Sequence, residues 1–314
     1  MDRAGGRLQG GALTDTGVAR HSPGTRAWVV PVVLLLVAMT SIQLGASFAK
    51  GLFPRIGAQG ATALRLGFSA LILAVVQRPW RGLRLNRSIL PLLAYGVSLG
   101  AMNTLFYMSI RTVPLGIAIA LEFVGPLGVA MLGSRRWIDG LWIALAVGGL
   151  ALLLPLQRSA HGIDPGGALL ALGSGAGWAL YIVFGRRVGQ AYGGRGAALG
   201  MIIAAAAFAP LGVAHAGPAL FSATILPAGF LLALLSSAVP YSLEMSALTR
   251  LPSRAFGTLM SLEPAIGALA GLAFLAETPS PFQWAGIGAI ILASLGTALT
   301  LGSGEVGEPQ PLPT

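Results

Sequence analysis

Long apolar stretches constrain the fold of this chain more than any other feature. About 20 apolar residues in a helix cross the roughly 30 Å hydrocarbon core of a bilayer. The sequence contains ten apolar stretches of about 16–21 residues joined by short connections, so it predicts an all-α integral membrane protein with ten transmembrane helices. The predicted spans are residues 28–48, 60–77, 89–109, 113–132, 140–156, 166–184, 197–214, 226–247, 254–275 and 282–301.

The composition agrees with a membrane protein and disfavours an enzyme. Of the 314 residues, 55% are hydrophobic and 10% are charged, whereas a soluble domain carries about 25% charged residues. The absence of cysteine excludes disulfides and thiolate metal sites. The three histidines fall in predicted tails or loops, so neither a metal nor a cofactor is predicted. The chain also lacks the H-E-x-x-H, G-x-S-x-G and P-loop motifs that a hydrolase or an ATP-driven pump would need.

The placement of the basic residues predicts the orientation in the membrane. If the N-terminus is cytoplasmic, 15 basic residues lie on the inner side and four on the outer side, with Arg65 left inside a span. Such a bias marks the cytoplasmic face. We therefore expect a multi-pass protein of the inner (plasma) membrane with both termini in the cytoplasm, and the net charge of +10 requires no nucleic-acid partner. The inner set is Arg3, Arg7, Arg20, Arg26, Arg78, Arg81, Arg84, Arg87, Arg135, Arg136, Arg186, Arg187, Arg195, Arg250 and Arg254, and the outer set is Lys50, Arg55, Arg111 and Arg158.

An internal sequence repeat divides the chain into two halves. Pro114 and Pro126 recur as Pro252 and Pro264, at an offset of 138 residues. Five spans per half is an odd number, so the second half would enter the membrane from the opposite side, and the repeat is predicted to be inverted. Inverted halves around a midplane site are typical of secondary transporters. The predicted regions are a disordered cytoplasmic tail (1–27), a first five-helix repeat (28–156), a second repeat (157–302) and a cytoplasmic C-terminal tail (303–314).

Glu122 is the first candidate site residue. A charged group inside lipid costs about 2.5–3.5 kcal/mol on insertion scales, so a charged residue within a span indicates a function that requires it. Pro126, one turn later, has no backbone N–H and therefore frees a carbonyl near Glu122. Ala118 and Gly125 make that helix face thin. A carboxylate beside a free carbonyl suits an ammonium group or a carried proton. The alternative is a protonated glutamate that only joins two helices.

Three more charged groups lie within or at the ends of predicted spans. Glu263 precedes the second helix-breaking proline, Pro264, and could bind a ligand or could fix a kinked helix. Glu244 could contact a substrate or pair with Arg250 at the cytoplasmic side. Arg65 could bind a carboxylate, could pair with an intramembrane glutamate, or could reach the outer surface with its long side chain.

Neutral polar residues repeat on the two inverted partner spans. Asn103 and Tyr107 lie on the third span, and Ser237 and Tyr241 lie on the eighth, on the same face as Glu244. Together they could hydrogen-bond a small polar solute. Each alone could equally join two helices.

Several motifs resemble a known transporter family. In the second half, the segments Leu259–Pro264, Leu275–Thr278 and Gln283–Gly286 resemble the EamA repeat of the drug/metabolite transporter superfamily. A narrower resemblance, to the bacterial threonine/homoserine exporter branch, covers about residues 28–301. The segments that carry it are Ser41–Ser47, Ala63–Leu66, Tyr95–Gly100, Val113–Phe123 and Pro240–Met245. The resemblance implies a ten-helix inner-membrane exporter of amino acids driven by the proton gradient.

The resulting hypothesis is export of small amino acids by proton antiport and alternating access. Glu122 would bind the substrate ammonium or the proton, and Arg65 or a broken helix end would meet the carboxylate. The neutral residues Asn103, Tyr107, Ser237 and Tyr241 would bind the side chain. The expected partners are an amino acid, protons and the lipid bilayer, with a homodimer left open. The alternatives are a carrier for other metabolites or drugs, a membrane enzyme and a passive channel.

Overall fold

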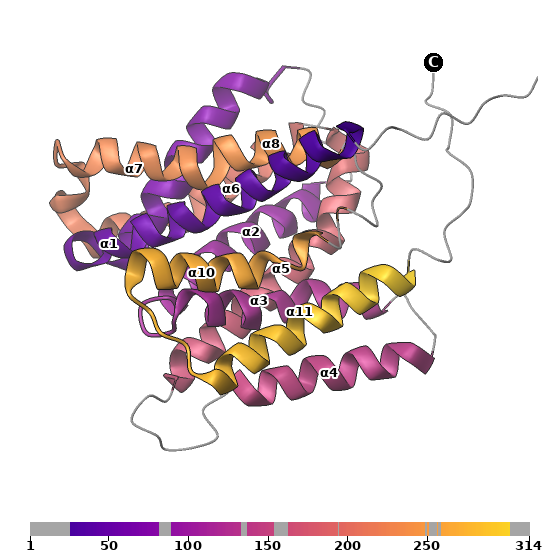
Figure 1. Ribbon diagram of the computed structural model, residues 1–314. Helices are drawn as coiled ribbons and strands as arrows, with labels where there is room; N and C mark the ends of the chain where they lie inside the picture. Colours follow the sequence, from indigo (N-terminus) through magenta and orange to yellow (C-terminus); the bar gives the residue numbers. More distant parts are fainter. Residues whose placement is uncertain are drawn as a thin grey trace, which may run out of the picture.

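The computed structural model describes residues 26–81, 89–132, 137–153, 163–193, 195–248, 250, 256 and 259–301. All regular structure within these residues is helical, so the predicted all-α class is confirmed (Figure 1). Most of the predicted tails lies outside the described residues. The beginning of α1 and the end of α11 lie at the same side of the bundle in Figure 1.

The helices follow the predicted apolar stretches closely. They are α1 (Arg26–Gln77), α2 (Ile89–Ser109), α3 (Leu115–Leu132), α4 (Trp137–Leu153), α5 (Pro165–Tyr192), α6 (Arg195–Ala216), α7 (Ile225–Ala233), α8 (Val239–Leu248), α10 (Glu263–Leu275) and α11 (Pro281–Leu301). A 3₁₀ turn, η1 (Gly217–Phe221), precedes α7, and a π-helical turn, η2 (Leu234–Ala238), joins α7 to α8.

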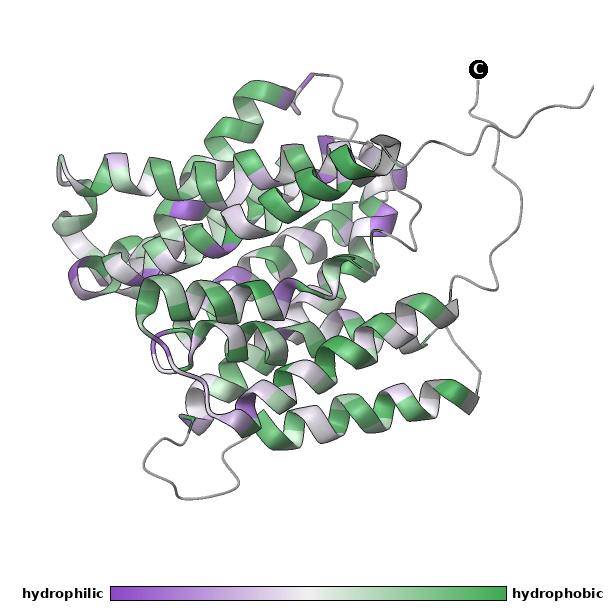
Figure 2. Ribbon diagram, in the orientation of Figure 1, coloured by the Kyte–Doolittle hydropathy of each residue, from purple (hydrophilic) through white to green (hydrophobic). Residues whose placement is uncertain are grey.

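Four helical stretches of the described residues are long and apolar enough to cross a membrane, and five shorter helices are also apolar. Much of the outer surface is apolar as well (Figure 2). A multi-pass membrane protein can expose such a surface because its solvent is lipid. The number of crossings remains a prediction. The four long stretches are Val29–Gln77, Ile89–Ser109, Pro165–Tyr192 and Arg195–Phe221.

The chain between the first two predicted spans is helical, although the sequence predicts a connection at residues 49–59. Helix α1 runs through this segment and is broken only at Gly57, whose φ is 69° and ψ is 170°. Glycine adopts a positive φ without steric cost. The ring of His215 packs on Gly57, where an added Cβ would lie 2.8 Å from Nε2. Gly57 therefore joins two helical arms that lie against different neighbours.

The ninth predicted span, residues 254–275, is also interrupted. Ser261 and Leu262 form a turn, and α10 begins at Glu263 with Pro264 in its first turn. Proline is favoured there because its fixed φ fits a helix and its missing N–H would have no partner anyway. Pro264 thus starts a helix, so the expected kink inside a continuous helix is wrong, whereas Pro126 does lie inside α3.

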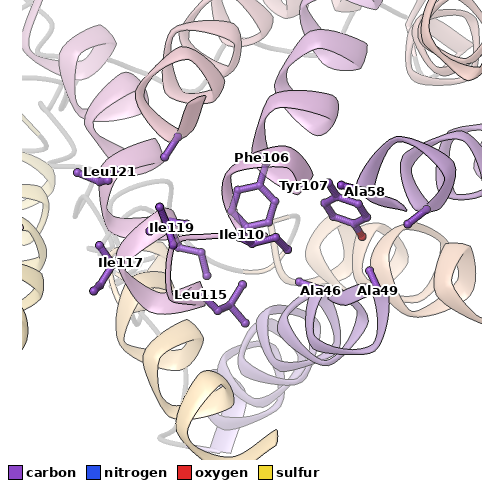
Figure 3. Close-up of a cluster of buried hydrophobic side chains, with 14 of the residues drawn as sticks. Ala46, Ala49, Ala58, Phe106, Tyr107, Ile110, Leu115, Ile117, Ile119 and Leu121 are labelled. Carbon is purple, nitrogen blue, oxygen red and sulfur yellow. The ribbon is translucent and has the colours of Figure 1, made fainter. Parts of the chain in front are cut away.

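Helix packing places the middle of the chain at the centre of the bundle. Helix α1 packs on α6, α7, η2 and α8, α2 packs on α5 and α6, α3 packs on α5, α10 and α11, and α4 packs on α11. The largest apolar cluster joins the end of α2 to the start of α3 (Figure 3). Tyr107, Ile110, Leu115 and Leu121 in this cluster are fully buried. This core fixes the helices that carry Tyr107 and Glu122.

Candidate functional site

Glu122 lies where α3 and α5 approach each other backbone to backbone. A Cβ added to Gly175 would lie 2.5 Å from the carbonyl oxygen of Glu122, and one added to Gly125 would overlap the carbonyl of Gly175. Pro126 lies four residues after Glu122 and cannot donate to that same oxygen. The two glycines therefore allow α5 to cover a carbonyl that α3 leaves without a helical donor.

A hydroxyl group that the sequence analysis did not single out holds the Glu122 side chain. Glu122 is 8% exposed, and the Oγ of the fully buried Ser174 donates to its Oε1 at 2.5 Å. The same Oγ lies 2.8 Å from the carbonyl oxygen of Met102 in α2. A serine hydroxyl has one proton, so it can donate to only one of these oxygens at a time. Ser174 therefore links α2, α3 and α5 at the carboxylate.

The π-helical turn η2 leaves two carbonyl groups without a helical donor. A helical carbonyl normally accepts from the N–H four residues later, or five residues later in a π-turn. Pro240 stands at these distances from Ser236 and Leu235 and has no N–H to donate. The hydroxyl of Ser41 in α1 donates to the Leu235 carbonyl at 2.7 Å.

Arg65 occupies the other open carbonyl. Its Nη2 donates to the Ser236 carbonyl at 3.3 Å, and its Cζ lies 5.3 Å from the centre of the Tyr107 ring. The guanidinium therefore faces the bundle interior, and the alternative that it reaches the outer surface is wrong. Its charge acts on Glu122, yet within the described residues no carboxylate lies within ion-pair distance of it.

Glu263 is less completely partnered than Glu122. It is 7% exposed, and its Oε1 lies 3.5 Å from Nε2 of Gln43 in α1, a long hydrogen bond. Its Oε2 has no partner in the described part of the chain. The carboxyl group stands in the first turn of α10, where the helix dipole favours negative charge. It also lies within electrostatic range of Glu122 and Glu244.

The predicted neutral polar residues differ in what they contact. Asn103 is buried and donates to its own helix, from Nδ2 to the Leu99 carbonyl at 2.8 Å. The hydroxyl groups of Tyr107 and Ser237 are buried and have no partner among the described residues. The side chain of Tyr241 lies outside the described residues. Tyr107 and the η2 turn thus meet at Arg65, whereas Asn103 mainly supports its helix.

Glu244 lies within electrostatic range of Glu263 and also faces a cavity. It is half-buried and lines a cavity of about 980 Å³, together with Tyr95, Tyr181 and Arg195. Within the described residues it forms no ion pair with Arg250, so the predicted alternative of a purely structural pair is not realised. Glu244 instead faces an open volume.

The other end of the bundle is closed by an ion pair. Lys50 Nζ in α1 lies 2.5 Å from Oε1 of Glu277, which follows α10. The backbone N–H of Leu115, the first residue of α3, donates to Oε2 of Glu277 at 2.7 Å. Glu277 therefore ties α1, α3 and α10 together, a link that the sequence analysis missed because its partners are far apart in the chain.

A second link closes the same end. Asp164 caps the start of α5 by accepting from the N–H of Gly167 at 2.8 Å, and the hydroxyl of Thr112 donates to the same carboxylate at 2.7 Å. The Thr112 bond, followed by the backbone bond from Gly167, holds the pKa of Asp164 below its ordinary value. No group of three potential metal-ligating side chains occurs in the described ranges.

Comparison with known proteins identifies the family. The model described as "EamA-like transporter family" matches residues 165–299. "Threonine/homoserine exporter RhtA" of Escherichia coli (strain K12) is 56% identical over 272 residues, which cover 87% of this chain and 92% of that protein. The chain belongs to the EamA-like transporter family. This assignment confirms the resemblance seen in the sequence, and it makes the chain a membrane transporter and not an enzyme.

One further relative and one solved structure are similar to this EamA-like transporter. "Uncharacterized transporter YwfM" of Bacillus subtilis (strain 168) is 30% identical over 248 residues, which cover 75% of this chain and 82% of that protein. A solved structure described as "Crystal structure of protein" has a TM-score of 0.55 and 19% identity, and covers 89% of this chain and 99% of that chain. At that identity the likeness shows a shared fold alone.

Proposed function

We propose that this transporter exports small amino acids of the threonine and homoserine type across the inner membrane, by proton antiport and alternating access. The substrate class rests on the exporter that is 56% identical over 92% of its length. One observation supports the mechanism: the Arg65 charge acts on Glu122, yet within the described residues the two side chains form no ion pair. A zwitterion can occupy such a site because it supplies the missing partner for each charge.

The proposed architecture is ten crossings in two inverted five-helix halves, with both termini in the cytoplasm. The helix bounds support it, since each predicted span coincides with helical segments in the described residues. The shared side of the start of α1 and the end of α11 also supports it (Figure 1). In this orientation the Lys50–Glu277 pair closes the periplasmic end.

In the proposed cycle, Glu122 binds either a proton or the substrate ammonium. Arg65 would turn from the Ser236 carbonyl to the substrate carboxylate, a favourable exchange because a hydrogen bond from a guanidinium to a carboxylate is stronger than one to a main-chain carbonyl. The hydroxyls of Tyr107 and Ser237, which have no partner among the described residues, support binding of a polar side chain. Tyr241 remains a candidate for the same role. Glu263 is the second carboxyl group that could carry the proton.

The mechanism is tested with Glu122→Gln in inside-out membrane vesicles. We expect wild-type protein to accumulate labelled threonine when a proton gradient is imposed, and the variant to lose this accumulation by about 100-fold or more, as expected when a required proton carrier is removed. Thr104→Val is the matched control, because the Thr104 hydroxyl donates only to the Gly100 carbonyl of its own helix. Full proton-driven accumulation by the glutamine variant would remove Glu122 from the mechanism.

The substrate class needs a separate test, because an exporter of other metabolites or drugs would have the same fold. Cells that overproduce the protein should survive concentrations of threonine or homoserine that inhibit cells carrying an empty vector. A panel of toxic amino-acid analogues and unrelated drugs defines the range. Protection against the drugs alone would contradict the proposed substrate.

A further inference from the structure

The cavity that contains Glu244 lies at the opposite end of the bundle from the Lys50–Glu277 pair. Helix α5 runs between these ends, from the cap at Asp164 to Tyr192 at the cavity, and its 28 residues span about 40 Å. The cavity volume is about 980 Å³, and small-molecule pockets commonly have about 300–1,000 Å³. The cavity can therefore hold an amino acid with its hydration water.

Three polar groups of the cavity wall have no partner among the residues that the structure describes. Oε1 of Gln77 and the hydroxyl of Tyr192 are buried without a hydrogen-bond partner in the described residues. Glu244 has neither a hydrogen bond nor an ion pair within the same residues. A buried polar group without a partner is costly, so a ligand that donates hydrogen bonds would be favoured here. An ammonium group donates three.

An aromatic pair gives this part of the cavity a rigid wall. The rings of Tyr95 and Tyr181 are stacked, with centroids 4.8 Å apart and an angle of 23° between the planes. Gly200 and Gly185 hold the Tyr95 ring, because a Cβ at Gly200 would overlap it and one at Gly185 would lie 3.2 Å away. Aromatic faces attract cations, so this wall adds to the preference for an ammonium group.

A fixed guanidinium also lines the cavity. Nη1 of Arg195 donates to the carbonyl of Arg81 at 2.7 Å, and within the described residues the other N–H groups of the guanidinium remain for a ligand. A guanidinium matches a carboxylate in charge and shape. The cavity wall therefore contains acceptors for an ammonium group and donors for a carboxylate.

We propose that this cavity is a loading site for free α-amino acids, separate from the site at Glu122. Glu244, Gln77 and Tyr192 accept hydrogen bonds from the ammonium group, and Arg195 binds the carboxylate. The site rests on the proposed function for its orientation, since it loads the substrate only if this end faces the cytoplasm. It recognises the zwitterion and leaves the choice of side chain to the central site.

The test compares transport from the two faces of the membrane. Inside-out vesicles present the cavity to labelled threonine, and there we expect Glu244→Gln to raise the half-saturating concentration about tenfold, with an unchanged maximal rate. Glu244→Asp should recover most of this loss because it keeps the carboxylate. Counterflow into right-side-out vesicles starts from the other face and should retain the wild-type half-saturation. N-acetylthreonine, which lacks the ammonium group, should compete with threonine poorly in wild-type vesicles and equally poorly in the variant.

Val76→Ala is the matched control, because it changes the wall of the same cavity without removing a polar group. Tyr192→Phe, which removes only a hydroxyl, provides a second variant with a smaller rise if Glu244→Gln fails to fold. The inference is overturned if Glu244→Gln and Tyr192→Phe both have the same half-saturating threonine concentration as Val76→Ala. It is also overturned if Glu244→Gln abolishes proton coupling at an unchanged half-saturation. Absence of threonine uptake by the wild type would instead overturn the proposed function, and this inference with it.

Discussion

The two ends of the bundle use their polar groups in opposite ways. At one end, both carboxylate oxygens of Glu277 are engaged, and Asp164 accepts from a side chain and from the backbone. At the other end, Glu244 and Gln77 line a cavity without partners in the described residues. Paired charges close an end, and unpaired ones leave it ready for a ligand, so this conformation is closed on one side only.

The substitution with the largest expected effect on stability and export lies between the two ends of the bundle, where α3 contacts α5. Gly175→Ala would place a methyl group 2.5 Å from the Glu122 carbonyl, and overpacking of this kind costs about 1–3 kcal/mol. We expect a clear fall in melting temperature in detergent and loss of most export. At Gly173, two residues earlier, an added Cβ would be 3.4 Å from Leu105. Gly173→Ala should therefore be nearly neutral, and equal behaviour of the two variants would contradict the close backbone contact.

The closed end should open when its ion pair is broken. The chain has no cysteine, so Ser47→Cys, on α1 one turn from Lys50, is a clean reporter for a membrane-impermeant thiol reagent. We expect Glu277→Gln to raise its labelling about tenfold, equivalent to about 1.4 kcal/mol of lost closure. Arg55→Gln, at the same end but exposed, should leave labelling unchanged. Unchanged labelling in the Glu277 variant would mean that other contacts hold this end closed.

Ser174 links the closed and open regions through Glu122, and its removal should have an intermediate effect. Ser174→Ala leaves the buried carboxyl without its donor, a loss of about 1–3 kcal/mol, so we expect proton-driven export to fall several-fold to about 100-fold. Ser174→Thr keeps the hydroxyl and should recover part of the activity. If both variants transport like the wild type, the Ser174 bond has no role in the cycle.

The smallest effect concerns the exposed cap of α5. Because the pKa of Asp164 is lowered in the folded protein, its contribution to stability is fully present above the ordinary pKa of an aspartate. That contribution is lost only as the pH falls through the lower folded-state value. Asp164→Asn should therefore lower the melting temperature slightly at neutral pH and should not differ from wild type in strong acid. Thr112→Val should reproduce part of the change, and a larger effect in acid than at neutral pH would contradict this cause.

Much of the fold follows from the sequence because hydrophobic length alone identifies a spanning helix. The helical segment at residues 49–59 was missed because Lys50, Pro54 and Arg55 are typical of a loop, although tertiary packing keeps this segment helical. The interruption before Pro264 was missed for a related reason. A proline inside an apolar run predicts a break but not whether it kinks one helix or starts another.

The candidate site was only partly predictable. A charged residue in an apolar span stands out, so the sequence predicts Glu122, Glu263 and Arg65 as candidate site residues, and their role stays a prediction. Ser174 lies in a run of small residues without periodicity, and its partner Glu122 is 52 residues away. The pair of Lys50 and Glu277 joins positions 227 residues apart, and a single sequence does not show such pairs.

The contact between Arg65 and the main chain at Ser236 has a consequence for how this site can change during evolution. A carbonyl oxygen is present whatever the residue type, so the contact with Arg65 does not depend on the Ser236 side chain, which is instead constrained by its close packing on Gly45. Pro240 is different, because Pro240→Ala would introduce an N–H four residues after the Ser236 oxygen, which would then compete with Arg65 for that oxygen. The imino acid at position 240 thus influences the position of the Arg65 side chain through the hydrogen bond that it cannot donate.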